Sequence, residues 1–492
     1  MISRVLKILC FVILCSGQDE FVSEITTQSL STDMNITSEV FCILCECSEG
    51  LVNCTNRQIK EPFEKDDWEG LVSLKPTKID LSHNQISTLT RIGKLPIQYL
   101  NISNCELIQI DQGAFSRLQD LVSLDLSRNK LATSSMVRGV FAGPMMTTDR
   151  QALTPGPFQK IKFLSLAYND IHSLPQDLFI FMTFLTTLDL SGNPLAFIDQ
   201  VTMAAITDLI NLKELRLGSC ELETLPEGML RRQRKLHRLD LSDNRFTTVP
   251  AALNEAPKLI YLNFDKNPLP SIDKPTAISN LTNLQELQMC RLSKLQSIGA
   301  GGLGGLESLT SLRLCYNPRL TTLDPDFLAW TDEDEVEDWP ELKELYLNNN
   351  NLTTIDSHFL DRWDQLTRVD FSNNPYVCDC NSQWMVDVLT PLVENIAVDG
   401  STEHMICRKP QELRALSFTQ LKNTSKTLTC PESENVMELP IPDMAILLGI
   451  MIGIFATFPI VLIVVLLWRN GYFQKCRRKS NEDSDNEETD AF

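Results

Sequence analysis

The stretch Leu236-His-Arg-Leu239-Asp-Leu241-Ser-Asp-Asn244 decides the fold of this chain. Its frame has leucines at the first, fourth and sixth positions and an asparagine at the ninth. The frame recurs as Leu121-Val-Ser-Leu124-Asp-Leu126-Ser-Arg-Asn129-Lys-Leu131, and again from Leu342. Self-similarity of this kind predicts a solenoid, in which each repeat supplies one short strand and a return segment.

The ninth position of the frame, called the asparagine slot below, can be followed through most of the chain. It is occupied in turn by Asn84, Cys105, Asn129, Asn169, Asn193, Cys220, Asn244, Asn267, Leu292, Asn317, Asn350 and Asn374. Most steps have about 20 to 30 residues, the usual length of such a repeat. The two longer steps predict inserted loops, Ala132–Pro157 and the acidic Asp332–Asp338.

The frame explains how the repeats would pack. Paired leucines on either side of one residue point inward from a strand, and the residue between them points outward. One repeat cannot bury its leucines alone, so neighbours must stack. The asparagine amide satisfies backbone groups where the chain turns. Cys105 and Cys220 can stand there as small buried thiols, whereas Leu292 matches less well. We expect an α/β solenoid whose parallel strands line a concave face.

The ends of the chain predict secretion and membrane anchoring. Residues 1–17 combine Arg4 and Lys7 with an apolar core and small residues, as a cleaved signal does. The uncharged run Ala445–Trp468 is long enough to span a bilayer, and basic residues follow it from Arg469. This charge distribution predicts type I topology at the plasma membrane with an extracellular N-terminus. A lipid-anchor signal is the alternative, and the polar segment after Trp468 speaks against it.

Sequons and net charge agree with an extracellular protein. Six N-x-Ser/Thr triplets precede the predicted span and are expected glycosylation sites, Asn35, Asn53, Asn101, Asn280, Asn351 and Asn423. The net charge of −20 argues against nucleic acid as a partner.

Cysteines cluster on both sides of the repeats. One cluster contains Cys42, Cys45, Cys47 and Cys54, and the other contains Cys378, Cys380, Cys407 and Cys430. Short spacings of this kind can also hold zinc. An oxidising, secreted compartment favours disulfides instead.

Both clusters resemble the cysteine-rich flanking modules of extracellular leucine-rich-repeat proteins, and the resemblance covers about residues 41–430. It implies four bridges, Cys42–Cys47, Cys45–Cys54, Cys378–Cys407 and Cys380–Cys430. The whole architecture is similar to transmembrane adhesion and recognition receptors of the tartan/capricious type. An immunoglobulin or fibronectin pattern before the span, which several related receptor families have, is absent from this sequence.

The resulting organisation has eight parts. They are a signal peptide (1–17), a disordered segment (18–40), an N-terminal cap (41–60), the repeats (61–375), a C-terminal cap (376–430), a stalk (431–444), a transmembrane helix (445–468) and a cytoplasmic tail (469–492).

Cys290 and Cys315 suggest a further bridge. Each follows the second inward residue of its strand in consecutive repeats. In-register parallel strands place equivalent α-carbons about 4.8 Å apart, within the range that a disulfide tolerates. We predict a Cys290–Cys315 disulfide; two free thiols of the repeat are the alternative.

A ligand is expected on the concave face. Aromatic residues and arginines are favoured binding anchors, and the best cluster is Tyr261, Arg313, Tyr316, Glu344 and Tyr346. A glycan on Asn101 would project into the amino-terminal part, which favours the carboxy-terminal half. The alternative is a merely solvated sheet face. Aspartates between the leucines, such as Asp80 and Asp240, are ordinary in this repeat and carry no prediction.

The span and tail contain three weaker motifs. Gly449 and Gly453 form a G-x-x-x-G pattern that permits helix dimerisation. Cys476 is a candidate for palmitoylation, and the end at Phe492 resembles a ligand of PDZ proteins. A solvated tail is the alternative to both.

Together these features predict a cell-surface recognition or adhesion receptor that binds an extracellular protein ligand or receptor, and a second copy of the chain is one candidate for that partner. The alternative is a co-receptor that modulates the signalling of another receptor. Catalytic motifs are missing from the sequence, so we expect no enzyme, cofactor or metal.

Overall fold

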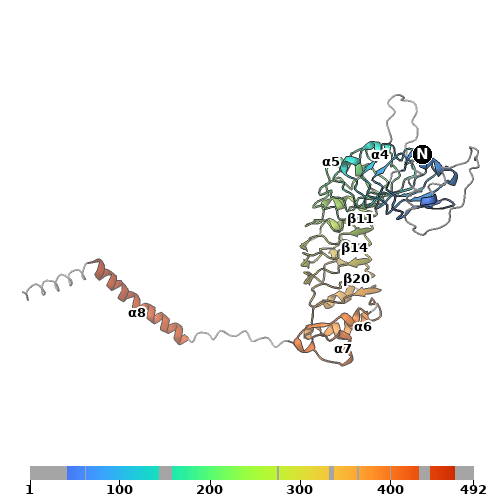
Figure 1. Cartoon of the computed structure of the whole chain (residues 1–492). Helices are drawn as coiled ribbons and strands as arrows, with labels where there is room; N and C mark the ends of the chain where they lie inside the picture. The colour runs from blue at the N-terminus through green and yellow to red at the C-terminus, as the bar shows by residue number, and fades with distance from the viewer. Residues whose placement is uncertain are drawn as a thin grey trace, which may run out of the picture. The chain divides into compact units, whose positions relative to one another are not determined.

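A computed structural model describes residues 42–60, 63–142, 158–273, 276–331, 337–362, 365–398, 400–430 and 444–470 (Figure 1). These residues fall into two compact units. Unit 1 contains Met1–Leu312 and Asp326–Pro340, and unit 2 contains Arg313–Pro325 and Glu341–Phe492. The predicted signal peptide, the segment 18–40 and most of the stalk and tail lie outside the described residues.

Unit 1 is built on a sheet of three-residue strands. They are β1 (Glu46–Ser48), β2 (Leu51–Asn53), β3 (Lys78–Asp80), β5 (Tyr99–Asn101), β7 (Ser123–Asp125), β8 (Phe163–Ser165), β9 (Thr187–Asp189), β10 (Glu214–Arg216), β11 (Arg238–Asp240), β12 (Tyr261–Asn263) and β14 (Glu286–Gln288). β1 and β2 are antiparallel, and from β2 onward each strand pairs in parallel with the next one named. The register is strict, with Leu215 opposite Leu239 and Leu239 opposite Leu262.

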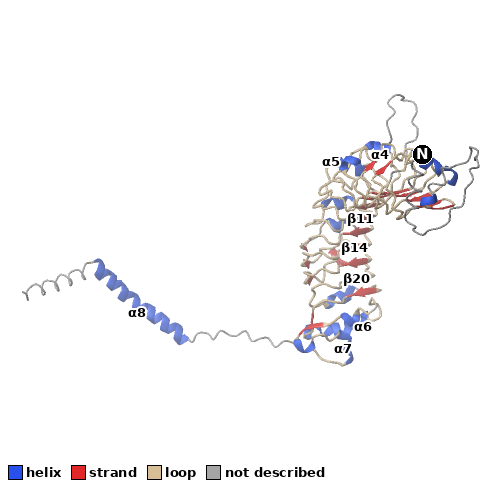
Figure 2. Cartoon of the chain, in the orientation of Figure 1, coloured by secondary structure: helices blue, strands red, loops and turns tan. Residues whose placement is uncertain are grey.

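The return segments of unit 1 contain only short elements. The strands are β4 (Thr88–Leu89), β6 (Gln109–Ile110), β13 (Ser271–Ile272), β15 (Ser297–Ile298), β18 (Trp330–Thr331) and β19 (Glu337–Asp338). The helices are α3 (Lys65–Gly70), α4 (Arg138–Ala142) and α5 (Gln200–Thr207), with single turns η1 (Val72–Leu74), η2 (Thr133–Ser135), η3 (Ala251–Glu255) and η4 (Ala277–Asn280). Figure 2 shows the strands lying side by side, joined by loops and these short helices.

The first part of unit 2 continues the parallel strands of the repeats, and its later part consists of short helices, turns and strands. β16 (Ser311–Arg313) stands at the boundary between the units, β17 (Thr322–Leu323) follows it, and β20 (Glu344–Tyr346) pairs in parallel with β21 (Arg368–Asp370). The remaining elements are β22 (Tyr376–Val377), β23 (Cys407–Lys409), α6 (Thr390–Val393), α7 (Phe418–Asn423), α8 (Met444–Arg469), a π-helix η7 (Met385–Leu389) and the turns η5 (Ser357–Arg362), η6 (Cys380–Ser382), η8 (Thr402–His404) and η9 (Gln411–Leu413).

The core is a column of leucines. Leu124, Leu239 and Leu345, at the centres of their strands, have no exposed surface, as the frame predicts. Every asparagine slot predicted from the sequence follows a strand of this kind. Burial of one leucine side chain contributes roughly 1.5–3 kcal/mol, so stacking many repeats stabilises a sheet whose separate strands would be unstable.

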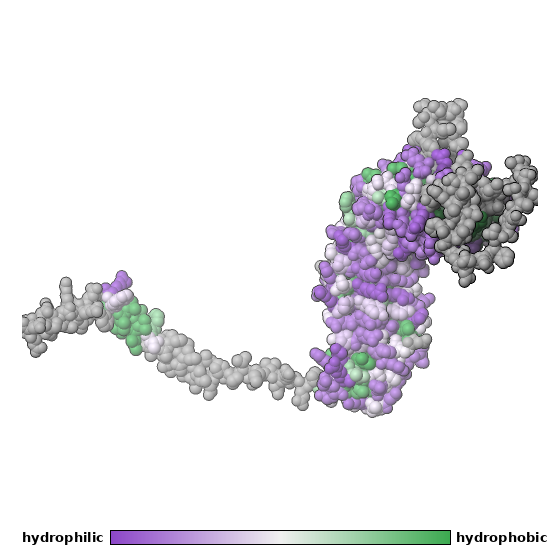
Figure 3. All heavy atoms as spheres, viewed as in Figure 1, coloured by the Kyte–Doolittle hydropathy of each residue, from purple (hydrophilic) through white to green (hydrophobic). Residues whose placement is uncertain are grey.

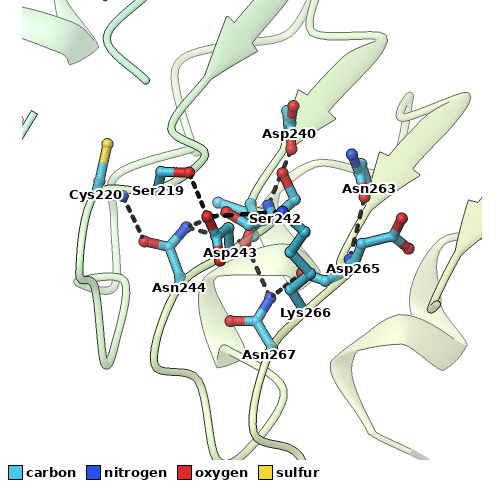
Figure 4. A network of polar contacts seen from close by, with 11 residues as sticks. Ser219, Cys220, Asp240, Ser242, Asp243, Asn244, Asn263, Asp265, Lys266 and Asn267 are labelled. Atoms are coloured by element: carbon cyan, nitrogen blue, oxygen red, sulfur yellow. Dashed lines mark hydrogen bonds and ion pairs between the residues drawn. The ribbon is translucent and has the colours of Figure 1, made fainter. Parts of the chain in front are cut away.

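The asparagine slot connects neighbouring repeats (Figure 4). Asn244 Oδ1 accepts hydrogen bonds from Cys220 N and Leu222 N, both at 3.0 Å. Its Nδ2 donates to Leu217 O at 2.8 Å and to Leu241 O at 2.9 Å. One buried amide therefore satisfies four backbone groups, three of them in the preceding repeat, and this explains why the position selects asparagine.

The two cysteines that replace asparagine in the slot still bind backbone of the preceding repeat. The Cys105 thiol donates to Leu81 O at 3.0 Å, and the Cys220 thiol donates to Leu190 O at 3.3 Å. A thiol has no counterpart to the accepting amide oxygen, so only the donor role is retained. Burial raises the pKa of Cys105 to about 11 and that of Cys220 to about 12. Leu292, which is fully buried, contributes packing alone.

The aspartates between the leucines have a structural function. Asp240 Oδ1 accepts from Ser242 N at 2.9 Å at the end of β11, and the same contact recurs in other repeats, as Asp80–Ser82, Asp125–Ser127, Asp189–Ser191 and Asp370–Ser372. These carboxylates close the turn that follows each strand. Burial opposes the charge of Asp80, but hydrogen bonds from Ser82 and Asn101 outweigh it and lower its pKa.

Disulfides flank the repeats at both ends. The structure contains Cys42–Cys47 and Cys45–Cys54 before them, and Cys378–Cys407 and Cys380–Cys430 after them, the four pairs that the resemblance implies. The two later bridges close loops of 29 and 50 residues, which lowers the entropy of the unfolded chain. Cys290 and Cys315 are both disulfide-bonded as well. That they bond to each other stays a prediction.

The apolar run near the end of the chain coincides with α8. The surroundings of residues 444–456 of this helix are not described, and the predicted dimerisation motif at Gly449 and Gly453 falls within them. Over the described part of the chain, the structure shows no helix with the length and apolar character that a membrane crossing requires.

We predict that Asn244→Ala lowers the free energy of unfolding by about 3 to 5 kcal/mol, because four buried backbone groups lose their partner. Urea denaturation followed by circular dichroism measures the change. Asn211→Ala is the control, since this amide makes only exposed hydrogen bonds among the described residues, to Thr183 O and from Lys235 Nζ; we expect a loss below about 1 kcal/mol. Equal stability of the two variants would contradict the role of the slot.

We also predict that Cys105 and Cys220 resist alkylation in the folded protein and react after denaturation without reductant, because burial disfavours the thiolate. Mass spectrometry of tryptic peptides under both conditions measures this. The same experiment should recover Cys290 and Cys315 in one linked peptide. Alkylation of either one without reductant would disprove their bridge.

Candidate functional site

Side chains on the sheet face of unit 2 form a small cluster. Leu314 N donates to Tyr346 O at 2.9 Å, which places Arg313 beside β20. The guanidinium carbon of Arg313 lies 4.3 Å from the centre of the Tyr346 ring. Its Nη2 is 3.8 Å from Glu344 Oε2. The ring and the carboxylate therefore hold the arginine in one orientation.

The two tyrosines of this cluster differ in how much of their side chain is exposed to a ligand. Tyr346 is only 8 % exposed, and burial raises the pKa of its hydroxyl. Its ring supports Arg313 and offers little surface to a ligand. Tyr316 is 48 % exposed and has a φ of 58°, since it stands in the turn just before the asparagine slot. The residue before the slot has a positive φ in the other repeats as well, so this conformation belongs to the turn of the repeat.

Tyr261, the fifth residue of the predicted cluster, belongs to unit 1. Arg238 lies over its ring, with the guanidinium carbon 3.9 Å from the centroid. Burial, together with the charges of Asp240 and Glu286, raises the pKa of Tyr261 to about 12. The hydroxyl is therefore neutral at physiological pH.

A second polar network lies on neighbouring strands of unit 1. Arg216 is bound by Glu214 at 2.8 Å and by Asp189 at 3.4 Å. Arg238 also approaches Glu214, at 3.9 Å. The connection between these charges depends on the register of β9, β10 and β11.

The amino-terminal sheet face contains a hollow of about 350 Å³, lined among others by Lys78, Tyr99, Asn101 and Phe163. Asn101 Nδ2 donates to Asp80 Oδ2 at 3.1 Å. The sequon asparagine thus stands in the wall of this hollow, where a glycan would occupy the space.

The turns after the strands contain a close contact around Tyr168 that the sequence pattern does not predict. Arg128 lies over Tyr168, 4.4 Å from the ring centre. On the next repeat stands Gly192, with a φ of 70°, where an added Cβ would lie 2.4 Å from Tyr168 Cδ1. This glycine is required by both its backbone and its neighbour, and only the stacking of repeats brings the two together.

The remaining predicted sites are the sequons, the lipidation site, the C-terminus and the inserted loops. Asn280, Asn351 and Asn423 are exposed, and Asn53 is half-buried. Asn35, Cys476 and the C-terminus at Phe492 lie outside the described residues, as do 143–157 and 332–336 of the predicted loops. Among the residues that the structure does describe, no group of three or more His, Cys, Asp or Glu side chains could hold a metal ion.

Family models agree with this geometry. Models described as leucine rich repeat match residues 96–143 and 210–269, residues 341–363 and residues 181–196. Three similar curated proteins each share 29 % identity with this chain. The match to osteomodulin of Rattus norvegicus covers 42 % of this chain and 49 % of osteomodulin, and the match to trophoblast glycoprotein of Macaca fascicularis covers 38 % of this chain and 51 % of that protein. The match to chaoptin of Drosophila melanogaster covers 35 % of this chain and 13 % of chaoptin. The chain thus spans about half the length of these relatives or less.

Among solved structures, a chain from the octameric complex of Latrophilin 3, Unc5D and FLRT2 is similar over 76 % of this chain and 96 % of its own, with a TM-score of 0.50 and 20 % identity. At this identity the match speaks for the fold alone. With the leucine core, the asparagine slots and the matching family models, it shows that the described chain carries leucine-rich repeats folded as a solenoid with a parallel sheet.

Proposed function

We propose that this chain is a cell-surface recognition or adhesion receptor that binds a protein ligand through the sheet face of its repeats. The observation that carries the proposal is the cluster of Arg313, Tyr316, Glu344 and Tyr346 on unit 2. The proposal assigns no catalytic role to the chain.

The cluster has the properties of a binding anchor. Arginine and tyrosine are enriched among residues that dominate protein interfaces. Arg313 is held by a ring below and a carboxylate beside it, so little side-chain entropy is lost on binding. Its Nε is buried and has no hydrogen-bond partner among the described residues. Tyr316 adds an exposed ring that an incoming surface could cover.

Similar architectures agree with this role. The sequence resembles adhesion and recognition receptors of the tartan/capricious type, and the solved chain with the same fold comes from a complex of several proteins. These likenesses support a binding role in general. The identity of the ligand must come from experiment.

We further propose that α8 crosses the plasma membrane once, with the repeats outside. Ala445–Trp468 contains no charged residue, and Arg469 begins a basic segment. The described part of α8 exposes large hydrophobic side chains from Phe458 to Trp468, and Figure 3 shows this segment in green. The predicted signal at residues 1–17 and the disulfides of the ectodomain support the same topology.

We predict that Arg313→Glu combined with Tyr316→Ala weakens ligand binding about tenfold or more, because both anchors are lost. Proximity labelling on cells that express the full chain supplies candidate ligands, and each is then tested for direct binding to the wild-type and variant proteins by biolayer interferometry.

The matched control is Arg319→Glu with His358→Ala, which removes an exposed arginine and an exposed aromatic ring of unit 2 outside the predicted cluster. We expect a change below about twofold, as for most residues outside the anchors of an interface. If no candidate binds directly, or if the control pair weakens binding as much as the cluster pair, the proposed surface is wrong.

For the topology, we predict that an epitope inserted at Gln18 is stained on intact cells, while one placed after Phe492 is stained only after permeabilisation. Flow cytometry measures both. Staining of the C-terminal epitope on intact cells, or release of the protein from membranes by alkaline carbonate, would disprove the proposed topology.

A further inference from the structure

A basic segment stands out in the acidic chain. Arg231-Arg-Gln-Arg-Lys235 has four cations in five residues, whereas the net charge of the protein is −20. The central Gln233 is 2 % exposed, and its Nε2 donates to Ile206 O at 2.8 Å. Since this amide points into unit 1 and anchors the turn, the basic side chains on either side of it face solvent.

Among the residues that the structure describes, two of these four charges have an acidic partner. Arg231 pairs with Glu255 at 3.0 Å, and Arg232 pairs with Asp208 at 2.9 Å. Lys235 Nζ donates to the neutral Asn211 Oδ1 at 2.7 Å, which leaves its charge uncompensated. Arg234 is exposed, and the described residues provide no acidic partner for it.

Three neighbouring repeats also carry lysines at the corresponding positions, whereas the repeat with its slot at Asn193 has none. Arg234, Lys235 and His237 stand ten, nine and seven residues before the slot at Asn244. In the repeats whose slots run from Asn169 to Asn267, these positions contain no acidic residue and carry in addition Lys160, Lys162, Lys213 and Lys258. Lys160 is neutralised by Asp120 at 2.7 Å, whereas Lys162, Lys213 and Lys258 are exposed without an ion pair among the described residues.

Backbone hydrogen bonds place the inner positions on consecutive rungs. Thr186 N donates to Lys162 O at 2.9 Å, and Lys213 N donates to Thr186 O at 2.7 Å. His237 N then donates to Lys213 O at 2.8 Å. Rungs of a sheet are about 4.8 Å apart. Lys162, Lys213, Arg234, Lys235 and Lys258 therefore lie along one side of the sheet of unit 1, called the basic edge below, and the rung of Thr186 interrupts it without a cation.

We propose that the basic edge binds a linear sulfated polysaccharide, a glycosaminoglycan chain. A row of cations along several rungs is complementary to an extended polyanion that carries many sulfates, and Arg234 can bind a sulfate through two N–H groups. Binding releases the counterions condensed on such a polyanion, which makes it strongly salt-dependent. Glycosaminoglycans are the polyanions that a secreted or cell-surface domain meets, so the choice of this class rests on the proposed topology.

This surface is separate from the proposed ligand site. The basic edge belongs to unit 1, at the entry of each strand, whereas the anchors Arg313 and Tyr316 belong to unit 2. Substitutions at one are not expected to affect the other. Failure of polysaccharide binding would therefore leave the proposed receptor function untouched, and the reverse also holds.

The test measures binding of the full chain, purified in detergent micelles, to immobilised heparin over a series of salt concentrations. The test variant combines Lys213→Gln, Arg234→Gln and Lys258→Gln. We expect an affinity loss of about tenfold or more and a shallower salt dependence, because three charge contacts disappear.

The control variant combines Lys94→Gln, Arg117→Gln and Lys130→Gln, which removes one arginine and two lysines from exposed positions elsewhere on unit 1. We expect its affinity to stay within about twofold of wild type. Thermal unfolding establishes that both variants fold. If the triple variant is unstable, Arg234→Gln alone should weaken binding severalfold, because this side chain has no structural partner.

Four results would overturn the proposal. One is the absence of wild-type binding to heparin at low salt. Another is equal binding to heparin whose sulfates have been removed. A third is an equal loss of affinity in the test and control variants. The last is tighter binding to phosphatidylserine vesicles or to polyglutamate that depends on the same three residues, since the edge would then serve a lipid surface or an acidic protein.

Discussion

A strand of three residues with one buried leucine at its centre has no stability of its own. It persists here because the next strand covers the leucine and because the backbone groups at the following turn find partners in a buried asparagine. Asn244 shows the whole arrangement, since its amide binds backbone of its own repeat and of the repeat before it. The solenoid depends on this one side chain, repeated, more than on any single contact of its surface.

The same constraint explains where variation is tolerated. Cys105 and Cys220 retain a donor toward the preceding repeat, so they preserve half of the connection. The strand-end aspartates act on the next turn, which is why they recur without marking a ligand site. The other outward positions of the strands neither fill the core nor bind the backbone at the turns. The chain can therefore vary them from repeat to repeat and build different surfaces on one framework.

Two such surfaces differ in chemistry. On the sheet face of unit 2, a stacked and paired arginine beside an exposed tyrosine suits a protein surface that must be recognised in detail. At the strand entries of unit 1, cations without acidic neighbours suit an extended polyanion. Recognition by the cluster on unit 2 depends on how its side chains are oriented. Recognition by the basic edge depends on how cations recur along the sheet. A receptor with both could bind a protein ligand while it is held near the sulfated polysaccharides of the cell surface.

The sequence by itself determined the solenoid, because leucine spacing and the asparagine slot report on burial and backbone satisfaction within each repeat. It also identified the cysteines that flank the repeats, and it placed Arg313, Tyr316, Glu344 and Tyr346 on outward positions. Tertiary structure decided how those side chains meet: that Tyr346 is buried beneath Arg313, that Gly192 must leave room for Tyr168, and that Gln233 turns inward so that its basic neighbours turn out. These outcomes depend on contacts between residues more than twenty positions apart, and a pattern within one repeat carries no information about which neighbour it will touch.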